Sequence, residues 1–147
     1  MGTQLQSKFY STASITRAAA AALIEAACVS AADMGIEAAV AVTDSAGNLV
    51  AFERTDGAPF LTSEVAINKA WTAASYNQAT HIWNAYLTND PAAAPLANIP
   101  RLMPVGGGCP VRENGILIGA IGISGGNALQ DQQIAEAALK SVGFDEE

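Results

Sequence analysis

The chain has 147 residues, of which 50% are hydrophobic and 14% are charged, so it is long enough for one globular domain and too apolar for an intrinsically disordered chain. Its net charge of -7 disfavours binding to the phosphates of nucleic acids or to an anionic membrane surface. These values predict a single domain over residues 1–147, with neither nucleic acid nor membrane as a partner.

The sequence also favours a cytoplasmic location. It holds no apolar run of the length that a signal peptide or a membrane span requires. The two cysteines, Cys28 and Cys109, form neither a disulfide framework nor a metal-binding spacing, which is typical of a reducing compartment. No metal site is predicted.

The N-terminal half predicts a helix, a hairpin and two more helices. An alanine-rich stretch without internal Gly or Pro predicts the first helix, over residues 14–34. Two apolar runs separated by Asp44–Asn48 predict an antiparallel hairpin of strands 36–43 and 49–54. Further helices are expected from Thr62 or Ser63 onward, and after Thr80 as a capping residue.

The C-terminal half predicts three strands and a last helix. Residues 89–101 contain three prolines and are expected to form a loop. Residues 102–105 and 109–111 are expected to be short strands interrupted by proline, and Asn114-Gly115 predicts a hairpin into strand 116–124. Gly119 and Gly122 on that strand indicate a closely packed neighbour. A helix over 129–142, ended by Gly143, completes the order α-β-β-α-α-β-β-β-α of an α+β fold.

Four motifs together resemble the GlcG/HbpS family, which includes the C-terminal domain of PduO-type corrinoid adenosyltransferases. The motifs are RTDGA at 54–58, KAWTAA at 69–74, GGGCPV at 106–111 and IGAIGISGG at 118–126. The resemblance extends from the first helix to the last. It implies a profilin-like α/β/α sandwich, in which helices cover both faces of a five-stranded antiparallel sheet. It also implies homo-oligomers, often octamers.

The resemblance leaves two functions open, since a family fixes a fold more firmly than a reaction. One is binding of a small planar ligand that carries carboxylates, such as haem or a related tetrapyrrole. The alternative is a cofactor-free lyase of aromatic catabolism, such as one that releases ammonia from 4-hydroxylaminobenzoate to give protocatechuate. In the lyase, Lys69 or Arg101 would hold the carboxylate and His81 would transfer protons.

Lys69 and His81 are the first candidate site residues. Lys69 lies on an apolar helix, where it either extends its ammonium to water or binds a carboxylate of the ligand. Thr72, one turn later, would point to the same side and is expected to be a ligand-binding residue as well. His81, the single histidine, is suited to proton transfer or to axial ligation of haem iron, although it can equally be exposed at a helix start.

The remaining candidates lie in or near the glycine run. Gly106, Gly107 and Gly108 are not followed by the Lys and Ser/Thr of a phosphate loop, and they would allow a flat ligand or a neighbouring subunit to approach. Cys109 is either a thiolate ligand of haem or a small core residue. Arg101 is either a carboxylate-binding group or a surface cation, and Trp83 either stacks on the ligand or fills the core.

Overall fold

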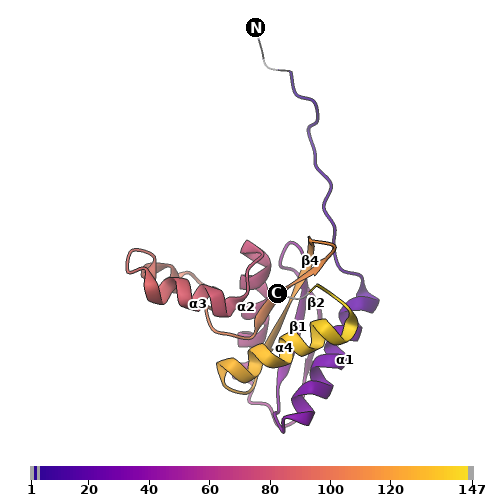
Figure 1. Ribbon diagram of the computed structural model, residues 1–147, viewed down its shortest axis with the longest axis vertical. Helices are drawn as coiled ribbons and strands as arrows, with labels where there is room; N and C mark the ends of the chain where they lie inside the picture. The colour runs from indigo at the N-terminus through magenta and orange to yellow at the C-terminus, as the bar shows by residue number, and fades with distance from the viewer. Residues whose placement is uncertain (1, 3, 146–147) are drawn as a thin grey trace.

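The fold consists of four helices, one 3-10 helix and four strands in the part of the chain that the structure describes. The structure is a computed structural model, and it describes residue 2 and residues 4–145. In chain order the elements are α1 (Arg17–Asp33), β1 (Ala39–Asp44), β2 (Leu49–Arg54), α2 (Leu61–Tyr76), α3 (Thr80–Asn89), η1 (Ala94–Asn98), β3 (Gly108–Glu113), β4 (Ile116–Ser124) and α4 (Ala128–Val142) (Figure 1).

The strands form one antiparallel sheet in the order β2-β1-β4-β3. Both predicted hairpins are confirmed, because β1 pairs with β2 and β3 pairs with β4. The two hairpins join through β1 and β4, where Ala39 lies opposite Ser124 and Asp44 lies opposite Gly119. The sheet therefore brings the glycine run before β3 close to the loop that follows β4.

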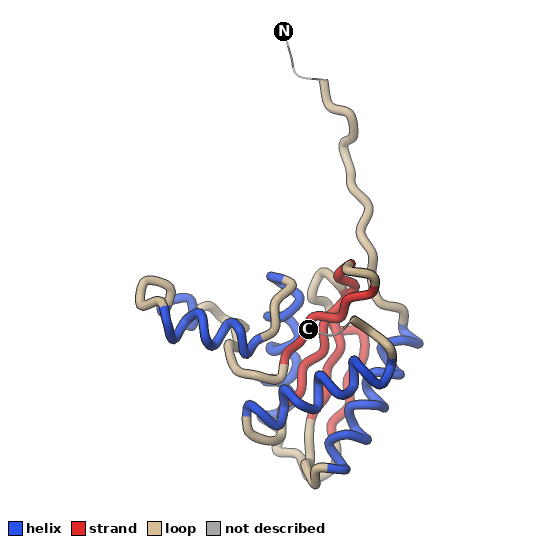
Figure 2. The backbone as a smooth tube through the Cα atoms, in the orientation of Figure 1, coloured by secondary structure: helices blue, strands red, loops and turns tan. Residues whose placement is uncertain are grey.

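Helices cover both faces of this sheet, as expected (Figure 2). Val40 and Val42 of β1 face the larger core, which α1 and α4 complete. Ala39 and Ala41 point to the other face, where α2 packs with its own alanines. The small side chains let α2 lie close to the sheet, and a Cβ added at Gly122 would clash with the backbone carbonyl of α2. The close neighbour predicted from the strand glycines is thereby confirmed.

The expectation of a five-stranded sheet is wrong. Residues 102–105 form no strand, and the sheet has four strands in the described part of the chain. The backbone groups of this segment bind side chains of the helices instead of a neighbouring strand. The N–H of Met103 donates to Thr72 Oγ1, the carbonyl of Pro104 accepts from Asn84, and the carbonyl of Val105 accepts from Thr80. Pro104 also lacks the N–H that a strand ladder requires.

Two smaller differences concern the helix ends. The first helix begins at Arg17 and not at residue 14, because Thr16 is its cap, and the Thr16 hydroxyl accepts a hydrogen bond from the N–H of Ala19. Thr80 does not cap α3, because Ala79 takes the cap position and Thr80 is the first helical residue.

The expected loop 89–101 contains the short helix η1, which packs on α3. We call α3 and η1 the α3 lobe, which protrudes from the body of the molecule (Figure 1).

Over the described residues, none of the helices has both the length and the apolar character needed to cross a lipid bilayer.

Candidate functional site

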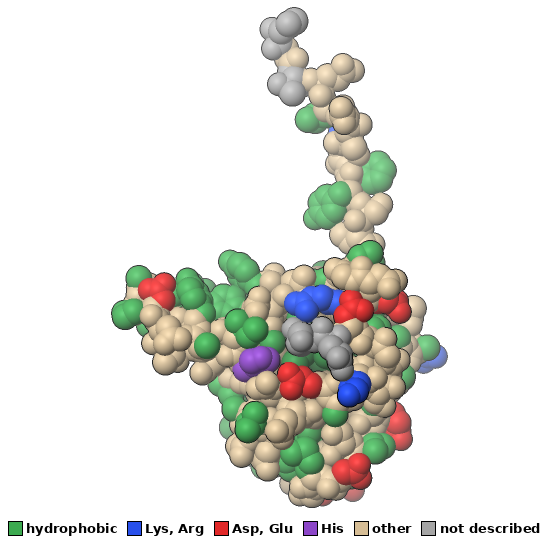
Figure 3. Space-filling view, in the orientation of Figure 1, with side chains coloured by type: hydrophobic (Ala, Val, Ile, Leu, Met, Phe, Trp, Pro, Cys, Tyr) green, Lys and Arg blue, Asp and Glu red, His purple; other side chains and the backbone are tan. Residues whose placement is uncertain are grey.

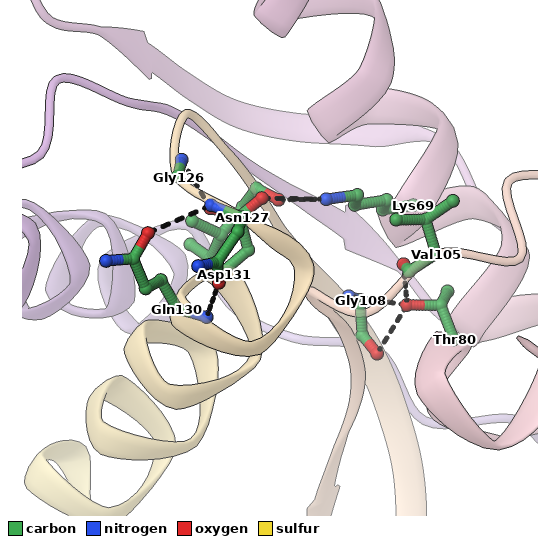
Figure 4. Close-up of polar contacts among 9 residues, drawn as sticks. Lys69, Thr80, Val105, Gly108, Gly126, Asn127, Gln130 and Asp131 are labelled. Atoms are coloured by element: carbon green, nitrogen blue, oxygen red, sulfur yellow. Dashed lines mark hydrogen bonds and ion pairs between the residues drawn. The ribbon is translucent and has the colours of Figure 1, made fainter.

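A buried ion pair between Lys69 and Asp131 connects the helices on opposite faces of the sheet. Lys69 comes from α2 and Asp131 from the first turn of α4, and each residue is 2% exposed. Lys69 Nζ lies 3.0 Å from Asp131 Oδ2 and donates at 2.9 Å to the carbonyl of Ile123 on β4 (Figure 4). The other carboxylate oxygen of Asp131 accepts from the N–H of Gly126 at 2.8 Å. The ammonium therefore does not extend to water.

The interior shifts both pKa values toward the neutral forms. Burial lowers the pKa of Lys69 and raises the pKa of Asp131, because each charged form loses its solvation. The charge of the partner opposes each shift, and so do the hydrogen bonds that Asp131 accepts. Each charge is stable in this position only while its partner is present.

The glycine run lies against this pair. Gly107 has a φ of 125°, and a Cβ added there would lie 2.9 Å from Lys69 Nζ and 2.8 Å from the Cβ of Asp131. A Cβ added at Gly108 would clash with the backbone of Lys69 and with the methyl group of Thr80. The groups that approach Gly107 and Gly108 in this structure thus belong to the same chain.

Two threonine hydroxyls hold the segment that contains the glycine run. Thr80 Oγ1 donates to the carbonyl of Val105 at 2.6 Å and accepts from the N–H of Gly108 at 2.8 Å (Figure 4). Thr72 Oγ1 donates to the carbonyl of Arg101 at 3.1 Å and accepts from Met103. Thr72, which was expected to contact a ligand, uses its hydroxyl on the backbone in this way. The role of Thr80 was not expected from the sequence.

His81 follows Thr80 on α3 and lines a surface cleft of about 260 Å³ with Gly106. We call it the His81 cleft, and its other lining residues are Asn84, Val105, Ala128, Leu129 and Gln132. The His81 side chain is half-buried, and its Nδ1 is buried without a hydrogen-bond partner among the described residues. A Cβ added at Gly106 would lie 2.9 Å from the carbonyl of Ala128. The glycine therefore lets the backbone of the glycine run lie against the start of α4.

The first turn of α4 forms one wall of the His81 cleft. A capping box fixes this turn: Asn127 Oδ1 accepts from the N–H of Gln130, and the Gln130 side chain accepts from the N–H of Asn127. Backbone N–H groups at a helix N-terminus favour an anionic group nearby. The amides of Asn84 and Gln132 add polar side chains to an otherwise apolar lining.

A second cleft, of about 450 Å³, lies along α3 and is mostly apolar. We call it the aromatic cleft, and its lining residues are Tyr76, Gln78, Ile82, Trp83, Tyr86 and Leu96. The Trp83 ring meets the Tyr76 ring edge-on at 5.2 Å and the Tyr86 ring at 6.1 Å. Trp83 is therefore a wall of this cleft, and it is not among the residues that line the His81 cleft.

Arg101 and Cys109 lie apart from both clefts. The Arg101 guanidinium stacks over the Trp71 ring at 4.6 Å and donates to Asn68 Oδ1. Cys109 is fully buried in the core between the sheet and the α1/α4 layer, as its interpretation as a small hydrophobic residue requires. Of the expected site residues, the structure brings Lys69, Gly107 and Gly108 together around the ion pair. It brings His81 and Gly106 together at the His81 cleft.

Within the described part of the chain, no three His, Cys, Asp or Glu side chains are grouped so that they could hold a metal ion.

Comparisons with known proteins agree in one family. A model of the HbpS-like family, described as haem degrading protein HbpS-like, matches residues 15–140. An uncharacterized 15.0 kDa protein of the dhaT–dhaS intergenic region of Citrobacter freundii is 38% identical over 132 residues, covering 86% of this chain and 91% of the relative.

Two solved structures are similar over nearly the whole fold. The crystal structure of HbpS has a TM-score of 0.84 and 32% sequence identity, and the alignment covers 97% of this chain and 99% of HbpS. The crystal structure of a PduOC–haem complex has a TM-score of 0.82 and 29% identity, with coverage of 90% of this chain and 97% of PduOC.

Proposed function

This chain belongs to the HbpS-like family, and from that premise we propose that it binds a haem-type tetrapyrrole in the His81 cleft. The family resemblance drawn from the sequence motifs is confirmed by the family match. A relative of the same fold was solved in complex with haem, which supports a ligand of this class.

The observation that carries the proposal is the placement of His81. Imidazole is the commonest protein ligand of haem iron. The single histidine of the chain lines an open cleft, and because its Nδ1 is buried, we assign the other ring nitrogen, Nε2, to the iron. Gly106 lines the same cleft, and a Cβ added there would lie 3.5 Å from the Cβ of His81, so no side chain from this position crowds the histidine.

Polar groups of the His81 cleft are suited to the carboxylates of a tetrapyrrole. The N-terminal turn of α4 provides backbone N–H groups. The amides of Asn84 and Gln132, which donate to the carbonyl of Pro104 and to Glu136, each have a second N–H. The apolar part of the lining, which includes Val105 and Leu129, suits the edge of a macrocycle.

We assign Lys69 a positioning role in this proposal. Its ammonium is occupied by Asp131 and Ile123, so it does not hold the ligand directly. Through Asp131 it fixes the first turn of α4, and through the packing of Gly107 it fixes the glycine run. Both segments border the His81 cleft.

Absorbance titration with haemin tests the proposal. The full chain is expected to give a saturable Soret shift that His81→Ala loses. Tyr86→Ala, in the aromatic cleft, and Cys109→Ala, in the core, are matched controls that are expected to retain the shift. Loss of the shift in Tyr86→Ala with retention in His81→Ala would move the ligand to the aromatic cleft and overturn the assignment.

The lyase alternative gives a different result in the same preparation. Two results together would replace the binding proposal with the enzymatic one. They are a haemin spectrum that the protein leaves unchanged and ammonia release from 4-hydroxylaminobenzoate by the full chain. The contacts of its candidate residues do not favour that reaction, because the Lys69 ammonium is paired with Asp131 and the Arg101 guanidinium stacks on Trp71.

A further inference from the structure

The N-terminal segment, residues 4–14, is an extended arm with exposed apolar side chains. The arm ends at Ile15, where the backbone N–H donates to the carbonyl of Ile118 on β4 at 2.8 Å. Leu5, Phe9 and Tyr10 are 66%, 80% and 85% exposed. Figure 1 shows the arm directed away from the sheet and from the α3 lobe. Two neighbouring aromatic residues thus lie outside the core of their own chain.

The aromatic cleft is a second apolar feature without a partner. Tyr76, Ile82 and Tyr86 along its rim are 72%, 43% and 48% exposed. Figure 3 shows hydrophobic side chains gathered over the α3 lobe and along the arm. Contiguous apolar patches of this kind are typical of interaction surfaces, and tyrosine and tryptophan are enriched where proteins meet.

We propose that residues 4–14 of one copy of this chain dock in the aromatic cleft of a second copy. The arm has the shape and chemistry that the cleft accepts, because it is extended and presents Phe9 and Tyr10 as anchors. Residues 4–14 span at most about 36 Å, which is enough to reach a neighbouring subunit. The arm leads away from the α3 lobe of its own chain, which favours exchange between copies (Figure 1).

The charge of the arm does not oppose its docking in the aromatic cleft. Lys8 is the single charged side chain in the arm, whereas the chain as a whole carries a net charge of -7. Asp90 at the end of α3 adds an acidic group to the α3 lobe. The arm itself therefore brings no negative charge to the acidic group of the α3 lobe. This interface uses the aromatic cleft and does not depend on a ligand in the His81 cleft.

The first test is the mass of the full chain in solution by light scattering over a concentration series. Phe9→Ser with Tyr10→Ser is expected to raise the concentration at which the assembly dissociates by about tenfold or more. Ile82→Ser with Tyr86→Ser is expected to have the same effect. Combining all four substitutions should add little to either pair, because the two pairs remove the same contact from its two sides. Ser11→Ala, in the same arm, is the matched control. Unchanged dissociation in both pairs would overturn the proposal.

Cross-linking shows whether the arm docks in the aromatic cleft of a second copy or in that of its own chain. A chain with Phe9→Cys is mixed with a chain with Tyr86→Cys, and the cross-linked peptides are identified, so that a bridge through the native Cys28 is recognised. A bridge between residues 9 and 86 of different chains supports the proposal. A bridge that forms only within one diluted chain carrying both substitutions would overturn it in favour of self-docking, and the absence of any such bridge would overturn it as well.

Discussion

Replacing Asp131 by Asn should destabilise the chain more than loss of an ordinary hydrogen bond. The carboxylate accepts from Lys69 through one oxygen and from the N–H of Gly126 through the other. An amide has one oxygen, so in either orientation its NH₂ group faces another donor. Removing one partner of a buried ion pair costs about 3–5 kcal/mol. We expect Asp131→Asn to lose free energy of unfolding of about that size at pH 7.

The double variant Lys69→Met with Asp131→Asn is the control for the charge. It leaves an amide with an unsatisfied NH₂, which costs about 1–3 kcal/mol, but no buried ammonium. It should therefore be more stable than Asp131→Asn alone. Urea unfolding followed by circular dichroism at fixed protein concentration measures both differences. A loss below about 1 kcal/mol in Asp131→Asn, or a double variant as unstable as the single one, would refute the reasoning.

The pH dependence of Asp131→Asn follows from the same pair. Without the carboxylate, burial alone acts on Lys69 and holds its pKa further below the usual value of 10.5. Between that lowered pKa and 10.5 the unfolded chain binds more protons than the folded chain. The free energy of unfolding should therefore rise with pH in this window, relative to the double variant, which lacks the lysine. A flat difference between the two variants would contradict the shift.

Three further outcomes are expected. Gly122→Ala should lower the free energy of unfolding by about 1–3 kcal/mol or more, because its Cβ would meet the α2 backbone. Gly115→Ala, in open space at a φ of 77°, should lower it by about 1 kcal/mol. Urea unfolding compares the two variants. Asn127→Ala should lower stability by about 1 kcal/mol through loss of the α4 cap, measured in the same way. Burial and the hydrogen bond to Glu53 raise the pKa of Cys28 to about 12. A thiol reagent at pH 8 should therefore react slowly with Cys28, and faster in the Glu53→Gln variant. Equal reaction rates in the two proteins would contradict the assignment.

Local signals in the sequence were enough for most of the fold. The turn at Asp44–Asn48 and the Asn114-Gly115 pair each predicted a hairpin that the structure contains. Turn geometry is decided by residues that are adjacent in the chain, so it can be read without knowing the rest of the molecule. The four family motifs were likewise sufficient for the family, which the comparison confirms.

Residues 102–105 show where local signals failed. An apolar run beside a glycine run resembles a strand, and the proline in it indicated only an edge position. The hydroxyls of Thr72 and Thr80 bind the backbone of this segment and remove it from the sheet. Both threonines are more than 20 residues away in the chain, so no pattern within the segment reveals them.

For the candidate site, too, the sequence indicated some residues, and only the tertiary structure decided their partners. A lysine within an alanine-rich helix stood out in the sequence, and so did a single histidine, but their surroundings did not. The chain holds 14 acidic residues, and only the packing of α4 beside the end of β4 made Asp131 the partner of Lys69. A buried charge must be paired, so the sequence implied that such a partner exists. Which residue fills that role depends on the path of the whole chain, because the interaction acts over a few ångströms between groups far apart in sequence.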